Sequence, residues 1–145
     1  MKDVIFLIHA GATLFLVGLI WTIQIVHYPL FANVGESGYA AYQTSHMTRI
    51  TYIVAPVMLA ELGTAVYFAF VDYAPINAKL FWFGLALAAL IWASTMFIQS
   101  PIHGRLAEKF DADLVNKLVL TNWIRTILWT VRGALVLWII WVKIK

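Results

Sequence analysis

The chain has 145 residues, of which 63% are hydrophobic and 12% are charged, whereas soluble domains have about 45–50% and about 25%. Its formal net charge is only +3 and the positive residues are scattered, which excludes a nucleic-acid-binding protein. The chain has no cysteine, which excludes disulfides, thiolate metal sites and haem attached through cysteine. The composition therefore predicts an integral membrane protein.

Four apolar segments, over residues 4–28, 46–71, 78–99 and 121–142, are each long enough to cross a hydrocarbon core, which takes about 20 residues. With their connections they occupy nearly the whole chain. We therefore expect a single all-α domain, a four-helix transmembrane bundle, with no room for a soluble domain. The first segment lacks a small-residue cleavage signature, so we expect it to be retained as a helix and not removed as a signal peptide.

The first helix is expected to end at Tyr28-Pro29, because proline lacks a backbone donor and disfavours helix in the residue before it. His9 and His27 are 18 residues apart, which is five whole turns, so they share one face near opposite ends. A polar stripe that faces lipid is costly, so this face should point into the bundle. The alternative is a pair of interfacial histidines bonded to backbone or water.

The second helix is predicted from about Tyr39 to Val71, longer than the membrane is thick, so its first turns should stand in the interface. Tyr42, His46 and Arg49 fall on one face of it, at spacings of four and three residues.

Glu61 lies deep in the second span and Arg132 stands at a similar depth in the last one. A carboxylate at such a depth needs a partner or contact with water. We expect the two side chains to pair, either as a structural ion pair between helices or as part of a proton relay.

The third helix is predicted from about Ala78 to Gln99 and should be ended by Pro101. His103 then lies between Pro101 and Gly104, one restricting the backbone and one freeing it. This position suits a ligand that must point one way, although an ordinary loop histidine is the alternative.

Residues 106–120 alternate charged and apolar side chains with a helical period, which is typical of an amphipathic helix on a membrane surface. We expect this short interfacial helix to precede the last span or to run straight into it. Within the last span, Asn122, Arg125, Trp129 and Arg132 recur at spacings of three, four and three, and this polar face should point inward.

The chain direction places a set of polar residues at one end of the bundle, because helices one and three end where helices two and four begin. The set comprises His27, His46, Arg49, Gln99, His103, Asn122 and Arg125. Lys and Arg are nearly balanced between the two faces. Without Arg49 and Arg125 the balance tips towards cytoplasmic termini, with the site facing the periplasm of a bacterial inner membrane.

Three imidazoles from three helical elements suit a transition metal such as copper, iron or zinc. The ligands would be His27, His46 and His103, with Gln99 and Asn122 fixing the ligand orientations. Alternatively, two of the same histidines would bind a b-type haem between the helices.

Arg49 and Arg125 suit haem propionates, or the carboxylate or phosphate of a lipid or an acidic substrate. Tyr42 is a candidate to supply protons or to carry a radical, although interfacial tyrosines are also common as an aromatic belt.

These residues favour a membrane oxidoreductase or oxygenase with a histidine-bound metal, acting on an apolar substrate from the bilayer. No nucleophilic serine arrangement, phosphate loop or carboxylate pair supports a hydrolase or a kinase. One alternative is a carrier, chaperone or transport subunit that binds an anionic lipid or metabolite through its arginines. Another is a structural partner subunit, and a homo-oligomer also stays open.

Four short motifs carry a resemblance that covers most of the chain. They are His27-Tyr28-Pro29-Leu30-Phe31, the Tyr42/His46/Arg49 set, Gln99-x-Pro101-x-His103 and Asn122-Trp123-x-Arg125-Thr126. Together they resemble small bacterial four-helix membrane proteins of unknown function and, more loosely, the anthrone oxygenase-like family. That resemblance implies a four-helix bundle and, for the characterised fungal members, oxygenation of aromatic polyketide anthrones. It transfers no catalytic residues to this chain.

The chain also looks like the haem-binding protoporphyrinogen oxidase family, which has four helices and a similar length. That family has a histidine near the start of its first helix, where His9 stands. Its other motifs do not match.

Overall fold

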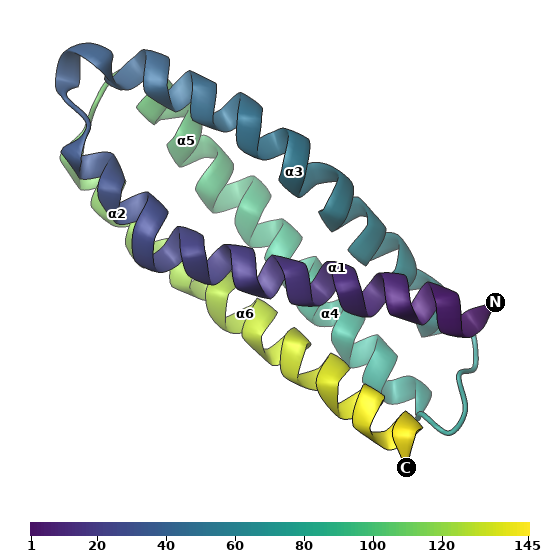
Figure 1. Ribbon diagram of the computed structural model, residues 1–145. Helices are drawn as coiled ribbons and strands as arrows, with labels where there is room; N and C mark the ends of the chain where they lie inside the picture. The colour runs from purple at the N-terminus through teal and green to yellow at the C-terminus, as the bar shows by residue number, and fades with distance from the viewer.

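The fold is a bundle of four long antiparallel helices, seen in a computed structural model that describes residues 1–145 (Figure 1). The chain ends lie at the same end of the bundle (Figure 1). The four helical stretches have 31 to 35 residues, which at a rise of 1.5 Å per residue gives about 47–53 Å. The hydrocarbon core is about 30 Å thick. All four stretches are apolar and long enough to cross it, so this is an integral membrane protein and the predicted fold class is confirmed.

The first hairpin consists of residues 2–70. Helix α1 (Lys2–Thr22) continues through a π-helix (Ile23–His27), a short α2 (Tyr28–Leu30) and a 3₁₀ turn (Phe31–Asn33). After a tight connection, α3 (Glu36–Phe70) returns antiparallel to α1 as one helix that includes Pro56.

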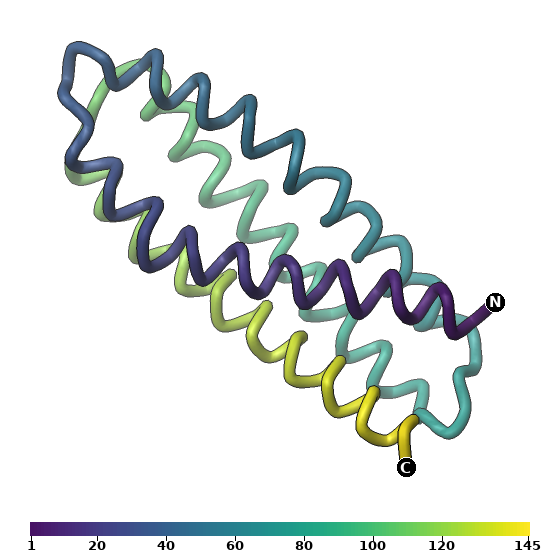
Figure 2. Tube along the Cα trace, viewed as in Figure 1, coloured from purple at the N-terminus to yellow at the C-terminus, as the bar shows by residue number.

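The second hairpin has the same construction and follows the loop of residues 71–77. Helix α4 (Ala78–Ser94) continues through a π-helix (Thr95–Gln99) into α5 (Ser100–Glu108), and α6 (Ala112–Ile144) returns (Figure 2). The side chain of Asp111 accepts a hydrogen bond from the backbone N–H of Leu114, which caps the start of α6.

Neither Pro29 nor Pro101 ends its helix, so the predicted ends at these two prolines are wrong. Each proline comes two residues after a π-helix. Proline lacks an N–H and its ring clashes with the carbonyl four residues earlier, which destabilises an ordinary α-helix. In the π-helix the bonds reach back five residues instead: the N–H of Tyr28 donates to the Ile23 carbonyl and that of Ser100 to the Thr95 carbonyl.

The predicted interfacial helix over residues 106–120 is not a separate element. The segment comprises the end of α5, a turn over residues 109–111 and the first turns of α6, which run straight into the last span as the second expectation stated. Its apolar residues Leu106, Leu114 and Leu118 are buried against Tyr28 and Phe31. The amphipathic pattern therefore arises where α5 and α6 join at the end of the second hairpin. The charged side chains of this segment lie outside, and its apolar side chains lie in the core.

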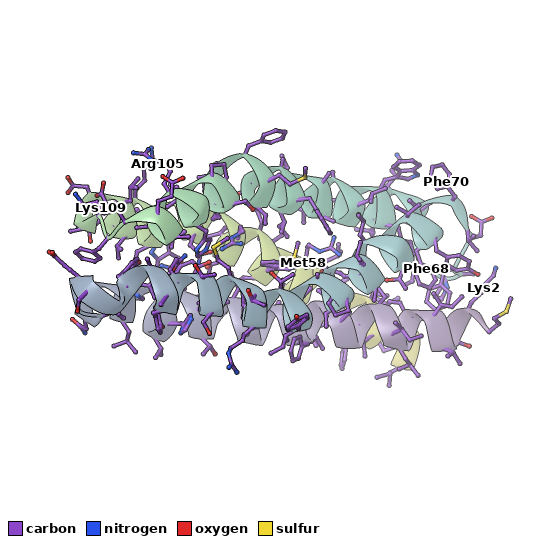
Figure 3. The ribbon with its side chains drawn as sticks, turned by 90° about the horizontal axis from the view of Figure 1, so that it is seen from above. Lys2, Met58, Phe68, Phe70, Arg105 and Lys109 are labelled. Carbon is purple, nitrogen blue, oxygen red and sulfur yellow. The ribbon has the colours of Figure 1, made fainter.

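The core is arranged in three apolar clusters along the bundle axis. Phe6, Phe68 and Phe81 belong to the cluster near the termini, and Met58 and Trp129 belong to the middle one. The third cluster is the one at the closed ends of the two hairpins. Figure 3 shows Lys2 and Phe70 at one end of the bundle, Arg105 and Lys109 at the other, and Met58 between them.

Candidate functional site

The structure brings together most of the polar residues that the chain direction was expected to collect at one end. His27 ends the first π-helix, His46 lies on α3, and His103 lies on α5. Asn122 and Arg125 lie one turn apart on α6. Each of the four helical stretches therefore contributes to one polar cluster inside the bundle.

The three histidines make two separate sets of contacts. His27 Nε2 and His46 Nδ1 are hydrogen-bonded at 2.9 Å. His103 instead contacts Tyr28 and Gln43: its Nε2 lies 2.8 Å from the Tyr28 hydroxyl and its Nδ1 lies 2.6 Å from the Gln43 amide. The rings of His46 and His103 are neighbours, with centroids 5.5 Å apart.

Arg125 joins this network from α6 and is buried, with 7% of its surface exposed. Its Nη2 donates to the Tyr28 hydroxyl at 3.1 Å, and its Nε donates to Asn122 Oδ1 at 2.9 Å. A longer contact of 3.5 Å joins Nη1 to Thr95 Oγ1. The Tyr28 hydroxyl therefore bridges the Arg125 guanidinium and the His103 imidazole.

Asn122 and Gln99 hold helices and Arg125 in place, and neither is hydrogen-bonded to a histidine. Asn122 Nδ2 donates to Gln24 Oε1 at 2.8 Å, while its own oxygen accepts from Arg125. Gln99 Nε2 donates to the Thr121 carbonyl at 3.2 Å. The role predicted for both, fixing the ring orientation of a histidine, falls to Gln43.

A cavity of about 270 Å³ begins at this cluster and extends into the apolar middle of the bundle. Its polar lining consists of Tyr28, His46, Thr51, Thr95, Gln99, Ser100, His103 and Arg125. Its apolar lining consists of Leu16, Leu19, Ile20, Ile23, Met47, Ile50, Val54, Ala55, Met58, Trp92 and Trp129. The cavity therefore has a polar end and a longer apolar part.

The cavity reaches the outside of the bundle between α3 and α5. Thr51 on α3 and Ser100 on α5 both line it and are both exposed. Close to them along the same stretches, Tyr52 and Phe97 expose 75% and 78% of their surface. Large exposed apolar side chains of this kind are typical of a lipid-facing surface of a membrane protein.

Two predicted site residues lie outside the cluster. Arg49 is exposed on α3 and its Nε donates to Ser45 Oγ at 3.2 Å. Tyr42 is half-buried and packs on Phe31, with ring centroids 5.6 Å apart. The prediction that these two residues lie with the histidines is therefore wrong.

The placement was wrong because two faces of α3, offset by about one residue in sequence, both fit the pattern of polar residues. The face of α3 that points inward follows Tyr39, Gln43, His46 and Met58. Helical spacing alone accepts either Tyr42 or Gln43 as the neighbour of His46. Gln43 could have been identified because it lies on the same helix face as Tyr39, His46 and Met58. Deeper in the helix this face becomes an apolar stripe, which marks it as the buried one.

The three histidines do not form a set of metal ligands. No group of three or more His, Asp or Glu side chains is arranged to hold a metal ion. Two imidazole nitrogens bound to one tetrahedral ion, each at about 2.0 Å, would lie about 3.3 Å apart with the ion between them. The 2.9 Å between His27 and His46 is a hydrogen-bond distance, and both nitrogens of His103 already have partners. The arrangement fits hydrogen bonding and proton exchange.

A second buried polar cluster lies nearer the termini. Glu61 and Arg132 form an ion pair, with Oε1 and Nε 2.9 Å apart and exposures of 1% and 2%. Trp129 Nε1 donates to the other carboxylate oxygen at 3.3 Å. His9 Nδ1 is 2.9 Å from Thr64 Oγ1, one turn along α3 from Glu61. The expected pairing is thus present, and its role as a structural pair or a proton relay stays a prediction.

Comparisons with protein-family models, with curated proteins and with solved structures give no match for this chain. The resemblance to anthrone oxygenase-like proteins therefore stays a prediction, and function has to be argued from the site.

Proposed function

We propose that the protein takes up a lipid-soluble molecule from the bilayer and exchanges a proton with its polar group, as part of an oxidoreductase or oxygenase reaction. One observation carries the proposal: a largely apolar cavity, whose lining reaches the exposed Thr51 of α3 and Ser100 of α5, ends at Tyr28, His46, His103 and Arg125. Pockets for small molecules are typically apolar with a few convergent polar groups.

The residues at the polar end are suited to proton transfer. Imidazole is the side chain that exchanges protons near neutral pH. The hydrogen bond from Gln43 occupies one ring nitrogen of His103, which leaves the other to act with the Tyr28 hydroxyl. Arg125 donates a hydrogen bond to the same hydroxyl, so the Tyr28 oxygen lies between the guanidinium and the His103 ring.

A second pair of groups leads away from the cavity. His46 lines the cavity and is hydrogen-bonded to His27, which is less buried. The second ring nitrogens of His46 and His27, which take no part in the bond between the two rings, are not buried without a hydrogen-bond partner. The two rings therefore offer a route for a proton between the cavity and the outer side of α1.

The orientation is part of the same proposal. The end that holds the termini carries Lys2, Lys79, Lys143 and Lys145, and the other end carries Arg49, Arg105, Lys109 and Lys117. Lys and Arg are enriched on cytoplasmic faces, but because Arg49 lies outside the cluster the two ends are balanced and the count favours neither orientation. A bacterial inner membrane, with cytoplasmic termini and the site towards the periplasm, stays a prediction.

The test blocks the cavity with a matched pair of variants. Ala55 lines the cavity on α3, whereas Ala60 is exposed on the same helix. Ala55→Leu should weaken binding of 4-nonylphenol at least tenfold, and Ala60→Leu should leave it unchanged. Binding is read from tryptophan fluorescence, because Trp92 and Trp129 line the cavity. Equal affinity in both variants would show that the ligand binds elsewhere.

Turnover is then measured as oxygen uptake and product mass with a panel of alkylphenols and alkylquinols. His103→Gln keeps a hydrogen-bonding side chain but cannot transfer a proton, so it should bind normally and lose turnover.

A carrier or chaperone is the second candidate. None of the serine and threonine hydroxyls that line the cavity is hydrogen-bonded to a histidine, so they lack the arrangement of an activated nucleophile. Binding of the probes without chemical change, together with transfer between vesicles, would favour this candidate.

A further inference from the structure

We propose that the ligand of this cavity is an amphipathic monoanion, with a carboxylate-like head at Arg125 and an alkyl or aromatic body in the apolar part. The inference rests on the proposed binding site and specifies the charge and shape of what it binds. It follows from the one buried charge that the protein leaves without a counter-ion.

Arg125 carries a permanent positive charge, because guanidinium is not deprotonated in proteins. Its hydrogen-bond partners are an amide oxygen and two hydroxyls, from Asn122, Tyr28 and Thr95, and all three are neutral. The ion pairs of the protein are Arg132–Glu61 and Lys143–Asp3, and neither includes Arg125. A buried charge without a partner of opposite sign is strongly unfavourable in a bundle that lies in lipid.

Arg132 shows how the same helix treats a buried arginine that no ligand can reach. It lies seven residues after Arg125, which is about two turns. Glu61 neutralises it at 2.9 Å. The cavity beside it measures about 10 Å³, no more than the space that one water needs. At Arg132 the counter-ion is built into the fold, whereas at Arg125 there is space and no counter-ion.

The space at Arg125 also defines the shape of the anion. A single cation favours a single negative charge, and a planar guanidinium matches a carboxylate. Tyr28, His46 and His103 surround the same end of the cavity and supply further hydrogen bonds to oxygen. The cavity of about 270 Å³ is close to the lower end of the range of about 300–1,000 Å³ for small-molecule pockets, which fits a body of medium length and not a full phospholipid.

The experiment compares decanoate with 1-decanol, which have the same chain length and differ in charge. Binding to the detergent-solubilised full chain is read from tryptophan fluorescence at neutral pH. The wild-type protein should bind decanoate at least tenfold more tightly than decanol. In Arg125→Gln this preference should fall to about one, and in the exposed control Arg49→Gln it should persist. Arg125→Lys should keep part of this preference, because lysine keeps the positive charge but lacks the two parallel N–H donors of the guanidinium.

Three outcomes would overturn the inference, and they separate it from the proposed function. If wild-type protein binds decanol as tightly as decanoate, and Ala55→Leu weakens both, the cavity binds neutral ligands and the proposed function stands. If chloride alone displaces decanoate while decanol is unaffected, the arginine holds a small inorganic anion. If neither probe binds and Ala55→Leu changes nothing, the proposed function fails as well. The wild-type comparison decides the matter even if Arg125→Gln does not fold.

Discussion

The two buried polar clusters of this bundle are built on the same helix, α6, but are completed in different ways. The cluster around Glu61 and Arg132 is closed: its charges neutralise each other and Trp129 covers the carboxylate. The cluster around Tyr28, His103 and Arg125 is open: it has a net charge and borders the main cavity. This difference is the basis of our proposal that the first cluster serves the folded state and that the second binds a molecule from outside.

The largest effect is expected from breaking the closed pair. Arg132→Leu leaves the Glu61 carboxylate buried without its partner, which should lower the free energy of unfolding by about 3–5 kcal/mol. Thermal unfolding in detergent measures this loss. The double variant Glu61→Leu/Arg132→Leu should recover much of it, because no charge is then left alone. An unchanged unfolding temperature in Arg132→Leu would contradict a structural role for the pair.

An intermediate effect is expected at the support of the open cluster. Gln43 is fully buried and contacts His103 Nδ1. Gln43→Leu leaves that ring nitrogen unpartnered, which should cost about 1–3 kcal/mol of stability and weaken ligand binding together with it. Thr48→Ala, on the exposed face of the same helix, should change stability by less than about 0.5 kcal/mol. Equal stability of the two variants would place His103 in contact with water.

A smaller stability effect is expected from Arg125→Leu, although it should abolish the preference for anions. Removing an unpaired charge offsets the loss of its hydrogen bonds, so the free energy of unfolding should change by about 1 kcal/mol or less. Chemical or thermal unfolding without ligand measures this change in the free energy of unfolding. A loss as large as that of Arg132→Leu would mean that the open cluster is also structural.

The smallest effect concerns Tyr73, in the loop at the terminal end. Its hydroxyl donates to Asp3 at 2.7 Å, and burial raises its pKa to about 12. The unfolded chain loses this proton near pH 10, before the folded protein does. The contribution of Tyr73 to the free energy of unfolding should therefore be fully present below pH 10 and be lost as the pH rises towards 12. Tyr73→Phe should remove this part of the pH dependence, as measured by unfolding between pH 8 and 11.5.

Much of the architecture could be predicted from the sequence because membrane spans are defined by apolar length. The convergence of His27, His46, His103 and Arg125 followed from the chain direction alone, since antiparallel spans bring alternate ends together. A charged or polar residue within an apolar span has few acceptable places, so it is a strong guide to the interior.

The details that depend on helix rotation could not be predicted in the same way. Arg49 and Gln43 lie on different faces of α3, and both are polar residues near the end of a span. Hydropathy does not separate them there, because the interface accepts polar groups on every side. Tyrosines near the interface are commonly part of an aromatic belt, so the sequence did not separate Tyr42 from Tyr28, whose hydroxyl lies at the centre of the cluster.

The two π-helices have a consequence for how the chain tolerates changes in length. A membrane span accepts the gain or loss of a residue, because tilt and flanking side chains absorb the mismatch. A π-helix holds one more residue per turn than the α-helix around it, and each residue turns the helix by about 100°. Deleting Val26 would let this turn close as an ordinary α-turn, because the bond between the Tyr28 N–H and the Ile23 carbonyl would then span four residues. The helix on either side would keep its register, but Pro29 would lose the π-helix before it. The extra residue of each π-helix therefore serves the proline that follows it, within spans that otherwise tolerate a change in length.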